Sequence, residues 1–386
     1  MKTVALRGKV VTDYEVWPEA TVLIEGGSIR DVGRDESLAA EAEEVHDYGD
    51  SLLVPGFVDL QVNGSFGVDV ASEPERLPEL SEKLLQTGTT SYLPTVISSL
   101  ESLYENTLPA LTAGIGGPPS GAEALGVHLE GPFLNLKKRG AHAASHISPP
   151  DAALLERLLD LTPVRMLTLA PELDGAEDLM ARACDRGVAV SAGHSDAPFE
   201  VAYRAFDHQV SCVTHLFNAM SPLHHREPGI PGAAFAHPLV VCGLIPDGLH
   251  VHPEMVGLAF RMLGPNRVYL TTDAMAAAGM SSGEYRLATR TVYLESGVPR
   301  LGSGAIAGSV LTMNEAFQNI LAFTGCTVPE AVRMASTTPA RLIGEGKRKG
   351  RLVPGYDADV AVISPGYTVE TVWRAGRQVY TPETTG

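Results

Sequence analysis

Two histidines in one stretch of the chain stand where they could bind a metal ion together. His194 follows the β-like run 188–192, and His215 follows the β-like run 212–214. The segment between the two runs carries apolar residues at helical spacing, which predicts a strand, a helix and a second strand. Both histidines then lie just past the carboxyl end of a parallel strand, the edge where α/β proteins place their chemistry.

A carboxylate at the end of an earlier strand completes a possible ligand set. Glu130 follows the strand-like run 126–129. Neutral imidazole is the commonest side-chain metal ligand, and two imidazoles with one carboxylate leave an open position for water. One histidine after a strand is more often a hydrogen-bonded loop residue than a ligand. Three such residues at three strand ends favour a site for one divalent ion.

The middle of the chain alternates strand-like and helical runs, and their number decides the fold. Eight strand-like runs with interleaved helices are typical of a (β/α)8 barrel of the TIM type. An open doubly wound sheet is the alternative, although no Gly-x-Gly-x-x-Gly turn follows the first strand. The strands are predicted at 53–59, 89–96, 126–129, 165–169, 188–192, 212–214, 240–245 and 267–271, and the helices at 75–86, 100–113, 152–161, 176–186, 198–206 and 253–263.

The segments outside these eight units are of two kinds. After the last strand we expect a hairpin at 285–301 and helices at 311–323 and 329–342, the second broken or kinked at Pro339. Both chain ends carry short alternating runs and Gly-containing turns, which are typical of β-hairpins. They predict one small β-sandwich domain built from residues 1–53 and 351–386, with a possible helical turn at 37–42. The barrel domain would then span 54–350.

Other strand ends also carry polar side chains. The first strand ends in DLQVNG, which contains Asp59, Gln61 and Asn63; the seventh ends at 247–250, and Asp273 follows the eighth. A barrel core prefers Val, Ile and Leu and leaves polar groups to the catalytic rim. This concentration favours an active site, although Asp59 and Asp273 could also cap loops, and Asn-Gly is a common turn pair.

The composition and charge of the chain limit the kinds of molecule that it is expected to bind. The chain has 386 residues and a net charge of −17, which disfavours nucleic acid and anionic membranes as partners. A small anionic substrate stays possible, since local arginines can bind a phosphate. The four cysteines are widely spaced, so we expect free thiols. We find no signal peptide and no membrane span at the sequence level, and we expect a cytoplasmic protein.

Seven motifs resemble the N-acetylglucosamine-6-phosphate deacetylases, a family of the amidohydrolase superfamily. They are LVPGFVDLQVNG, GVHLEGPF, SAGHS, THLFNAM, DGLHV, TTDAM and AIAGS, and the resemblance covers essentially the whole chain. PGFVD is shared across the superfamily, whereas HLEGPF and THLFNAM are particular to this family. The resemblance implies metal-dependent hydrolysis of N-acetyl-D-glucosamine 6-phosphate to D-glucosamine 6-phosphate and acetate. It also implies Asp273 as the catalytic residue and Glu130, His194 and His215 as metal ligands.

The resemblance further implies a substrate site and a homodimer. In the family an arginine that corresponds to Arg226 reaches the sugar phosphate across a dimer interface. Many members of the superfamily have His-x-His after the first strand and bind two metals; here Gln61 and Asn63 take those places, and amides are poor ligands, so the second site is expected to be vestigial. The other implied substrate residues are Ala141, His142, Asn218, Ala219, Asp247, Gly248, Leu249, His250, Ile306, Ala307 and Gly308.

Metal identity and reaction type stay open at the level of sequence. The ligand set suits Zn²⁺, Fe²⁺, Co²⁺ and Mn²⁺, and availability favours zinc or iron. In the expected mechanism a metal-bound water attacks the amide while Asp273 moves its proton to the leaving nitrogen. Another amidohydrolase activity, such as that of a deaminase or cyclic-amide hydrolase, is the nearer alternative. A catalytically inactive barrel used for binding is the other, but such a barrel would be expected to have lost these residues.

Overall fold

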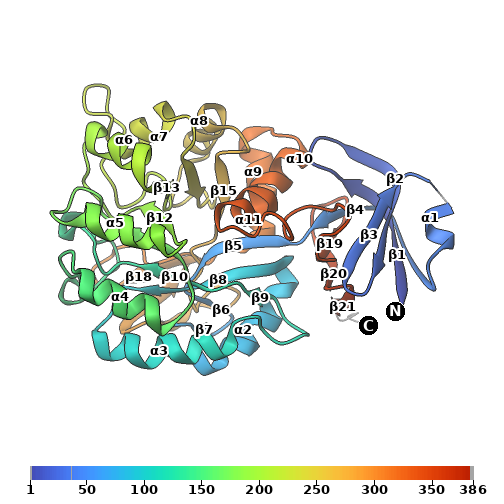
Figure 1. Cartoon of the computed structure of the whole chain (residues 1–386), viewed down its shortest axis with the longest axis horizontal. Coiled ribbons are helices and arrows are strands. Elements are labelled where there is room, and N and C mark those ends of the chain that lie inside the picture. The colour runs from blue at the N-terminus through green and yellow to red at the C-terminus, as the bar shows by residue number, and fades with distance from the viewer. Residues whose placement is uncertain (1, 36, 383–386) are drawn as a thin grey trace.

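The computed structural model describes residues 2–35 and 37–382 and contains a barrel beside a smaller sheet (Figure 1). Eight consecutive parallel strands build the barrel, and most of their side chains are buried, as strands covered by helices require. They are β5 (Phe57–Val62), β8 (Thr89–Ile97), β10 (Val127–Glu130), β11 (Val164–Leu169), β12 (Ala189–Ala192), β13 (Val210–Val213), β14 (Val241–Leu244) and β15 (Val268–Leu270). The predicted (β/α)8 barrel is confirmed.

Amphipathic helices lie between these strands, close to the positions that the sequence predicts. In α4, for example, the Asp151 side chain accepts a hydrogen bond from the backbone N–H of Leu154 and caps the first turn. One helix was not predicted, α7 (Gly229–Ala236), because its sequence GIPGAAFA contains two glycines and a proline, all poor helix formers. The others are α2 (Leu77–Leu84), α3 (Glu101–Gly114), α4 (Ala152–Leu161), α5 (Ala176–Asp185), α6 (Phe199–His208) and α8 (Pro253–Leu263).

The first and eighth barrel strands meet mainly through side chains rather than through a regular ladder. The backbone N–H of Asn63 donates to the carbonyl of Ala274 at 2.8 Å. The buried carboxylate of Asp59 accepts hydrogen bonds from the hydroxyls of Thr271 at 2.7 Å and Thr272 at 2.5 Å. Asp59 therefore joins β5 to the segment after β15, and it brings the two polar strand ends of this seam together.

Both chain ends combine into one seven-stranded sheet, which confirms the predicted small β-domain. Its strand order is β21-β20-β19-β4-β1-β2-β3, and the short helix α1 (Ser37–Ala40) packs against it. The domain boundaries at 53 and 350 stay predictions. The strands are β1 (Thr3–Val11), β2 (Val16–Glu25), β3 (Ser28–Gly33), β4 (Glu44–Pro55), β19 (Val360–Ile363), β20 (Val369–Arg374) and β21 (Arg377–Tyr380).

The predicted strand at 53–59 is in fact two strands of different sheets. Gly56 separates β4, in the small domain, from β5, in the barrel. A Cβ atom at Gly56 would lie only 2.1 Å from the hydroxyl oxygen of Thr90, so the crossing between the two sheets requires glycine. The continuous apolar run conceals this boundary, because both strands are buried.

The last part of the chain adds a hairpin sheet and a helix that contains a π-helical segment. The sheet contains β16 (Gly283–Leu287), β17 (Arg290–Glu295) and β18 (Val298–Leu301), and helix α9 (Met313–Thr324) follows. The predicted final helix consists of α10 (Val328–Val332), a π-helical segment at 333–337 and α11 (Thr338–Leu342). Residues at both joints keep right-handed helical angles, so the helical backbone continues through Pro339 without the predicted break, and a kink there stays a prediction. Short strands also occur as β6 (Gly64–Ser65), β7 (Val68–Asp69) and β9 (Glu123–Ala124).

Candidate active site

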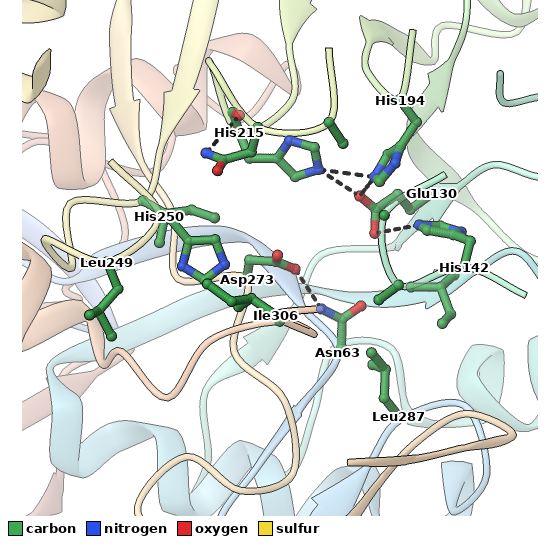
Figure 2. Close-up of a pocket in the computed structure, with 17 residues that line it drawn as sticks. Asn63, Glu130, His142, His194, His215, Leu249, His250, Asp273, Leu287 and Ile306 are labelled. Carbon is green, nitrogen blue, oxygen red and sulfur yellow. Dashed lines mark hydrogen bonds and ion pairs between the residues drawn. The ribbon is translucent and has the colours of Figure 1, made fainter. Parts of the chain in front are cut away.

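Glu130, His194 and His215 converge at the carboxyl end of the barrel (Figure 2). The Nε2 atoms of His194 and His215 lie 3.0 Å and 3.1 Å from Oε1 of Glu130, and 3.1 Å from each other. All three side chains are at most 6% exposed. The three residues come from the ends of β10, β12 and β13, so the sequence prediction that these strand ends meet agrees with the structure.

The backbone at these positions is strained. His194, His215 and Asp273 have φ angles of 49°, 32° and 50°, in the left-handed region that residues with a Cβ seldom adopt. Each follows its strand by two or three residues, where the chain turns sharply out of the barrel. Such strain persists only where the surroundings hold the residue firmly, and it gathers at functional sites.

The two imidazoles differ in their outer contacts. Nδ1 of His194 donates to the backbone carbonyl of Lys138 at 2.8 Å, which leaves Nε2 unprotonated and able to bind a metal. Nδ1 of His215 is buried and has no hydrogen-bond partner among the described residues. Burial raises the pKa of Glu130, but its close contacts with the imidazoles of His194 and His215 lower the pKa by more, and the net pKa lies well below the ordinary value.

His142 provides a neutral donor beside this cluster. Its Nδ1 accepts hydrogen bonds from the backbone N–H of Ser98 at 3.2 Å and from the Ser98 hydroxyl at 2.9 Å. The ring proton therefore lies on Nε2, which is 3.8 Å from Oε2 of Glu130. Burial and the neighbouring His194 lower the pKa of His142 to about 3, so the ring stays neutral and can donate to a substrate oxygen.

Asp273 faces the cluster from the opposite side of the cavity, where two amides orient it. Its Oδ1 accepts hydrogen bonds from Asn63 Nδ2 at 2.7 Å and Gln61 Nε2 at 3.0 Å, and the same Gln61 nitrogen donates to Glu130 at 3.0 Å. Burial and the charge of Glu130 raise the pKa of Asp273 to about 7, a value suited to a general base near neutral pH. Gln61 and Asn63 act here as hydrogen-bond donors.

A second carboxylate–imidazole pair borders the cavity. Nδ1 of His250 lies 2.6 Å from Asp247, whose other oxygen accepts the backbone N–H groups of Leu249 and His250. Burial lowers the pKa of His250, but the hydrogen bond to Asp247 outweighs it, and the net pKa is raised. The contact with Asp247 therefore favours the protonated form of His250, which lies close to Asp273 (Figure 2).

These groups enclose a cavity of about 290 Å³, large enough for a small polar molecule. Five residues proposed from the sequence do not line this cavity: Gln61, Arg226, Asp247, Gly248 and Ala307. Gln61 and Asp247 still contact residues that line it. Arg226 is exposed, and its Nη1 lies 2.8 Å from Nε2 of His225. Four lining residues were not proposed, Ile97, Gly140, Ile245 and Leu287. The proposed residues that line it are Asn63, Glu130, Ala141, His142, His194, His215, Asn218, Ala219, Leu249, His250, Asp273, Ile306 and Gly308.

The donor set suits a divalent metal. A tetrahedral ion with bonds of ~2.0 Å separates its ligand atoms by ~3.3 Å, close to the 3.0–3.1 Å found among Glu130, His194 and His215. In the described part of the chain, no lysine or arginine pairs with Glu130, and no lysine or arginine lines the cavity. An external cation is therefore the natural partner for this buried carboxylate.

Comparisons with known proteins agree with this geometry. The amidohydrolase family pattern matches residues 52–379. N-acetylglucosamine-6-phosphate deacetylase of Bos taurus is 36% identical over 98% of this chain and 94% of its own length, and that of Bacillus subtilis is 35% identical over 92% and 91%. A Mycobacterium smegmatis deacetylase variant, solved in complex with N-acetyl-D-glucosamine-6-phosphate, is 32% identical, covers 99% of this chain and 100% of its own, and superposes with a TM-score of 0.92.

The fold, the ligand cluster and these matches define the class of protein. The chain belongs to the amidohydrolase family, whose members are metal-dependent hydrolases, and within it to the N-acetylglucosamine-6-phosphate deacetylases. Across residues 2–35 and 37–382, none of the helices has the length and apolar character needed to span a bilayer.

Proposed function

We propose that the protein hydrolyses the N-acetyl group of N-acetyl-D-glucosamine 6-phosphate to give D-glucosamine 6-phosphate and acetate. One observation carries this proposal: a Glu-His-His cluster fit for a metal ion and the carboxylate of Asp273 face the same buried cavity. The M. smegmatis relative, which shares the fold over its whole length, binds this sugar phosphate. Amide hydrolysis needs an activated water and a protonated leaving nitrogen, and the cavity has a group for each.

The side chains at the cavity have different roles in this hydrolysis. When bound by Glu130, His194 and His215, a divalent ion supplies Lewis acidity and a water of lowered pKa. Asp273, oriented by the amides of Gln61 and Asn63, accepts the proton of the attacking water and passes it to the leaving nitrogen. The Nε2–H of His142 donates to the carbonyl oxygen as negative charge develops on it.

The phosphate of the substrate is bound by cationic and polar groups at the cavity wall. His250, whose pKa is raised beside Asp247, offers an N–H, and Asn218 and Ala219 line the same cavity. Arg226 is exposed and outside this chain's cavity, which suits a guanidinium that acts on a second subunit. We propose a homodimer with Arg226 at the partner's phosphate site. An Arg226→Ala change should raise KM with little effect on kcat, while sedimentation reports the oligomeric state.

We propose one divalent ion per chain, with zinc favoured, and a cytoplasmic location. The imidazole and carboxylate ligands suit zinc, iron, cobalt and manganese. Gln61 and Asn63 are poor ligands, so a second ion would bind weakly, in a vestigial site. The cysteines carry free thiols, which suit a reducing compartment.

The decisive experiment joins metal content to acetate release. Purified protein should contain about one ion per chain and release acetate from N-acetyl-D-glucosamine 6-phosphate. Asp273→Asn should retain the ion and lose turnover by at least ~10²–10⁴-fold, the range of general acid–base catalysis. Metal without acetate release, but with activity on other amides, would favour a deaminase or cyclic-amide hydrolase. Absence of metal and activity after zinc reconstitution would favour an inactive barrel.

A further inference from the structure

Glu172, in the loop after β11, connects the two loops on either side of it. Its Oε2 accepts the hydroxyl of Ser195 at 2.6 Å, and its Oε1 accepts the backbone N–H of Asp196 at 2.6 Å and the side-chain amide of Asn135 at 2.8 Å. β11 lies between β10 and β12 in the barrel. One carboxylate thus fixes the loop after β10 and the loop after β12, which carries His194.

Both of these loops determine how the His194 imidazole is held. Ser195 and Asp196 follow His194 directly in the chain, so their bonds to Glu172 fix the backbone on one side of it. The carbonyl of His194 itself, which joins it to Ser195, accepts the backbone N–H of Asn135 at 2.9 Å. The carboxylate therefore limits how His194 can turn.

The same contacts shape the turn that orients the imidazole ring. The side-chain oxygen of Asn135 accepts the backbone N–H of Lys137 at 2.9 Å, while its amide donates to Glu172. This turn presents the carbonyl of Lys138 to Nδ1 of His194 at 2.8 Å. A ligating histidine is oriented by such a contact, which also selects the tautomer with a free Nε2. A chain of hydrogen bonds therefore runs from Glu172 to the ring of His194.

His194 needs such a support. Its φ of 49° is strained, and a strained residue relaxes when its surroundings loosen. Two of the three hydrogen bonds to Glu172 come from Ser195 and Asp196, which follow His194 in the chain. The third comes from Asn135, whose turn presents the Lys138 carbonyl to the His194 ring. None of the three binding partners is a metal ligand or lines the cavity.

We propose that Glu172 is a positioning residue that holds His194 in its metal-binding orientation. The inference rests on the proposed function only through the metal site and is independent of which substrate is hydrolysed. Removing the carboxylate lets the turn at Asn135 and the backbone at His194 relax, so the ion is bound less tightly. Glutamine retains an oxygen for Asn135 and Asp196, and its amide can donate to the Ser195 hydroxyl.

The test measures zinc release from the loaded, full-length protein to a chromogenic chelator. Glu172→Ala should release zinc about 10- to 100-fold faster than the native protein, the range for loss of an outer contact. Glu172→Gln should stay close to the native rate, and Asn135→Ala should fall between the two. Glu123→Ala is the matched control, because Glu123 also binds several donors but lies in the junction with the small domain.

The melting temperature of the metal-free proteins separates positioning from general stability. A merely structural Glu172 would lower that temperature without changing zinc release at a temperature where every variant is folded. Native release rates in both Glu172→Ala and Asn135→Ala would overturn the proposal, and so would equal acceleration in Glu123→Ala. Should Glu172→Ala fail to fold, Asn135→Ala carries the same test. Failure of native protein to release acetate would refute the proposed substrate but leave the zinc result interpretable.

Discussion

Within residues 2–35 and 37–382, two places gather three potential ligand atoms within 4.8 Å, and they differ in what neutralises their charge. At the barrel mouth these are Glu130, His194 and His215. At the junction of the barrel with the small β-domain they are Glu123, Asp357 and Asp359, and here Lys349 lies among them, with Nζ at 2.7 Å, 2.9 Å and 2.5 Å from the three carboxylates.

The difference separates a metal site from a structural ion network. At the junction the chain supplies its own cations, Lys349 and Arg348, and the three carboxylates need no other partner. At the mouth, Glu130 is the one carboxylate of the cluster and faces imidazoles, and no lysine or arginine of the described chain pairs with it. Proximity of acidic groups alone does not identify a metal site; the nature of the nearby donors and cations does.

The largest effect should come from removing the carboxylate of the cluster at the mouth, Glu130. Glu130→Gln replaces a charged ligand with an amide, a poor ligand for a transition metal. We expect metal affinity to fall by more than the ~100-fold typical of outer contacts, and acetate release to fall with it. Metal analysis after dialysis against a chelator measures this. Glu123→Gln should keep its metal under the same dialysis, and loss of metal from both variants would erase the distinction between the clusters.

An intermediate effect should come from removing the cation at the junction. Lys349→Met leaves three close carboxylates without their buried ammonium, and breaking a buried ion pair from one side costs about 3–5 kcal/mol of unfolding free energy. Metal content should not change. Urea unfolding measures the loss, with Lys9→Met as control, since Lys9 pairs with an exposed Asp50 at the surface. A Lys349→Met protein as stable as native would show that the junction network is dispensable.

The sequence predicted those parts of the site whose chemistry is local. Glu130, His194 and His215 follow recognisable strands, and parallel strands bring their carboxyl ends to one edge, so the cluster follows from the fold. Glu172 was missed because APE after a strand resembles an ordinary turn, and its role depends on contacts with Asn135 and Ser195 across two loops. Short-range patterns do not contain this information.

Part of the cavity wall and two features of the fold were not predicted from the sequence, for related reasons. Leu287 lines the cavity from the hairpin sheet after the barrel, and an apolar residue in a strand carries no chemical signal. The strand boundary at Gly56 depends on Thr90, a residue of another strand, and α7 forms although its glycines and proline disfavour a helix. Tertiary packing overrides local propensity in both cases.

The smallest effect should be a change in acid sensitivity at the junction. Burial raises the pKa of Glu123, but Arg348 and Lys349 lower it more, to about 2. Because the folded-state pKa lies below the unfolded value of 4.5, this carboxylate stabilises the fold above pH 4.5, and the stabilisation is lost as pH falls toward about 2. The slope is at most ~1.4 kcal/mol per pH unit for one proton. In Glu123→Gln the unfolding free energy should therefore depend less on pH between pH 4.5 and about 2. Glu101→Gln is the control, because Glu101 forms an exposed pair with Arg157, and this variant should keep the native dependence on pH. An unchanged slope in Glu123→Gln would mean that other carboxylates control acid unfolding, and that the cations at the junction hold Glu123 less tightly than these contacts indicate.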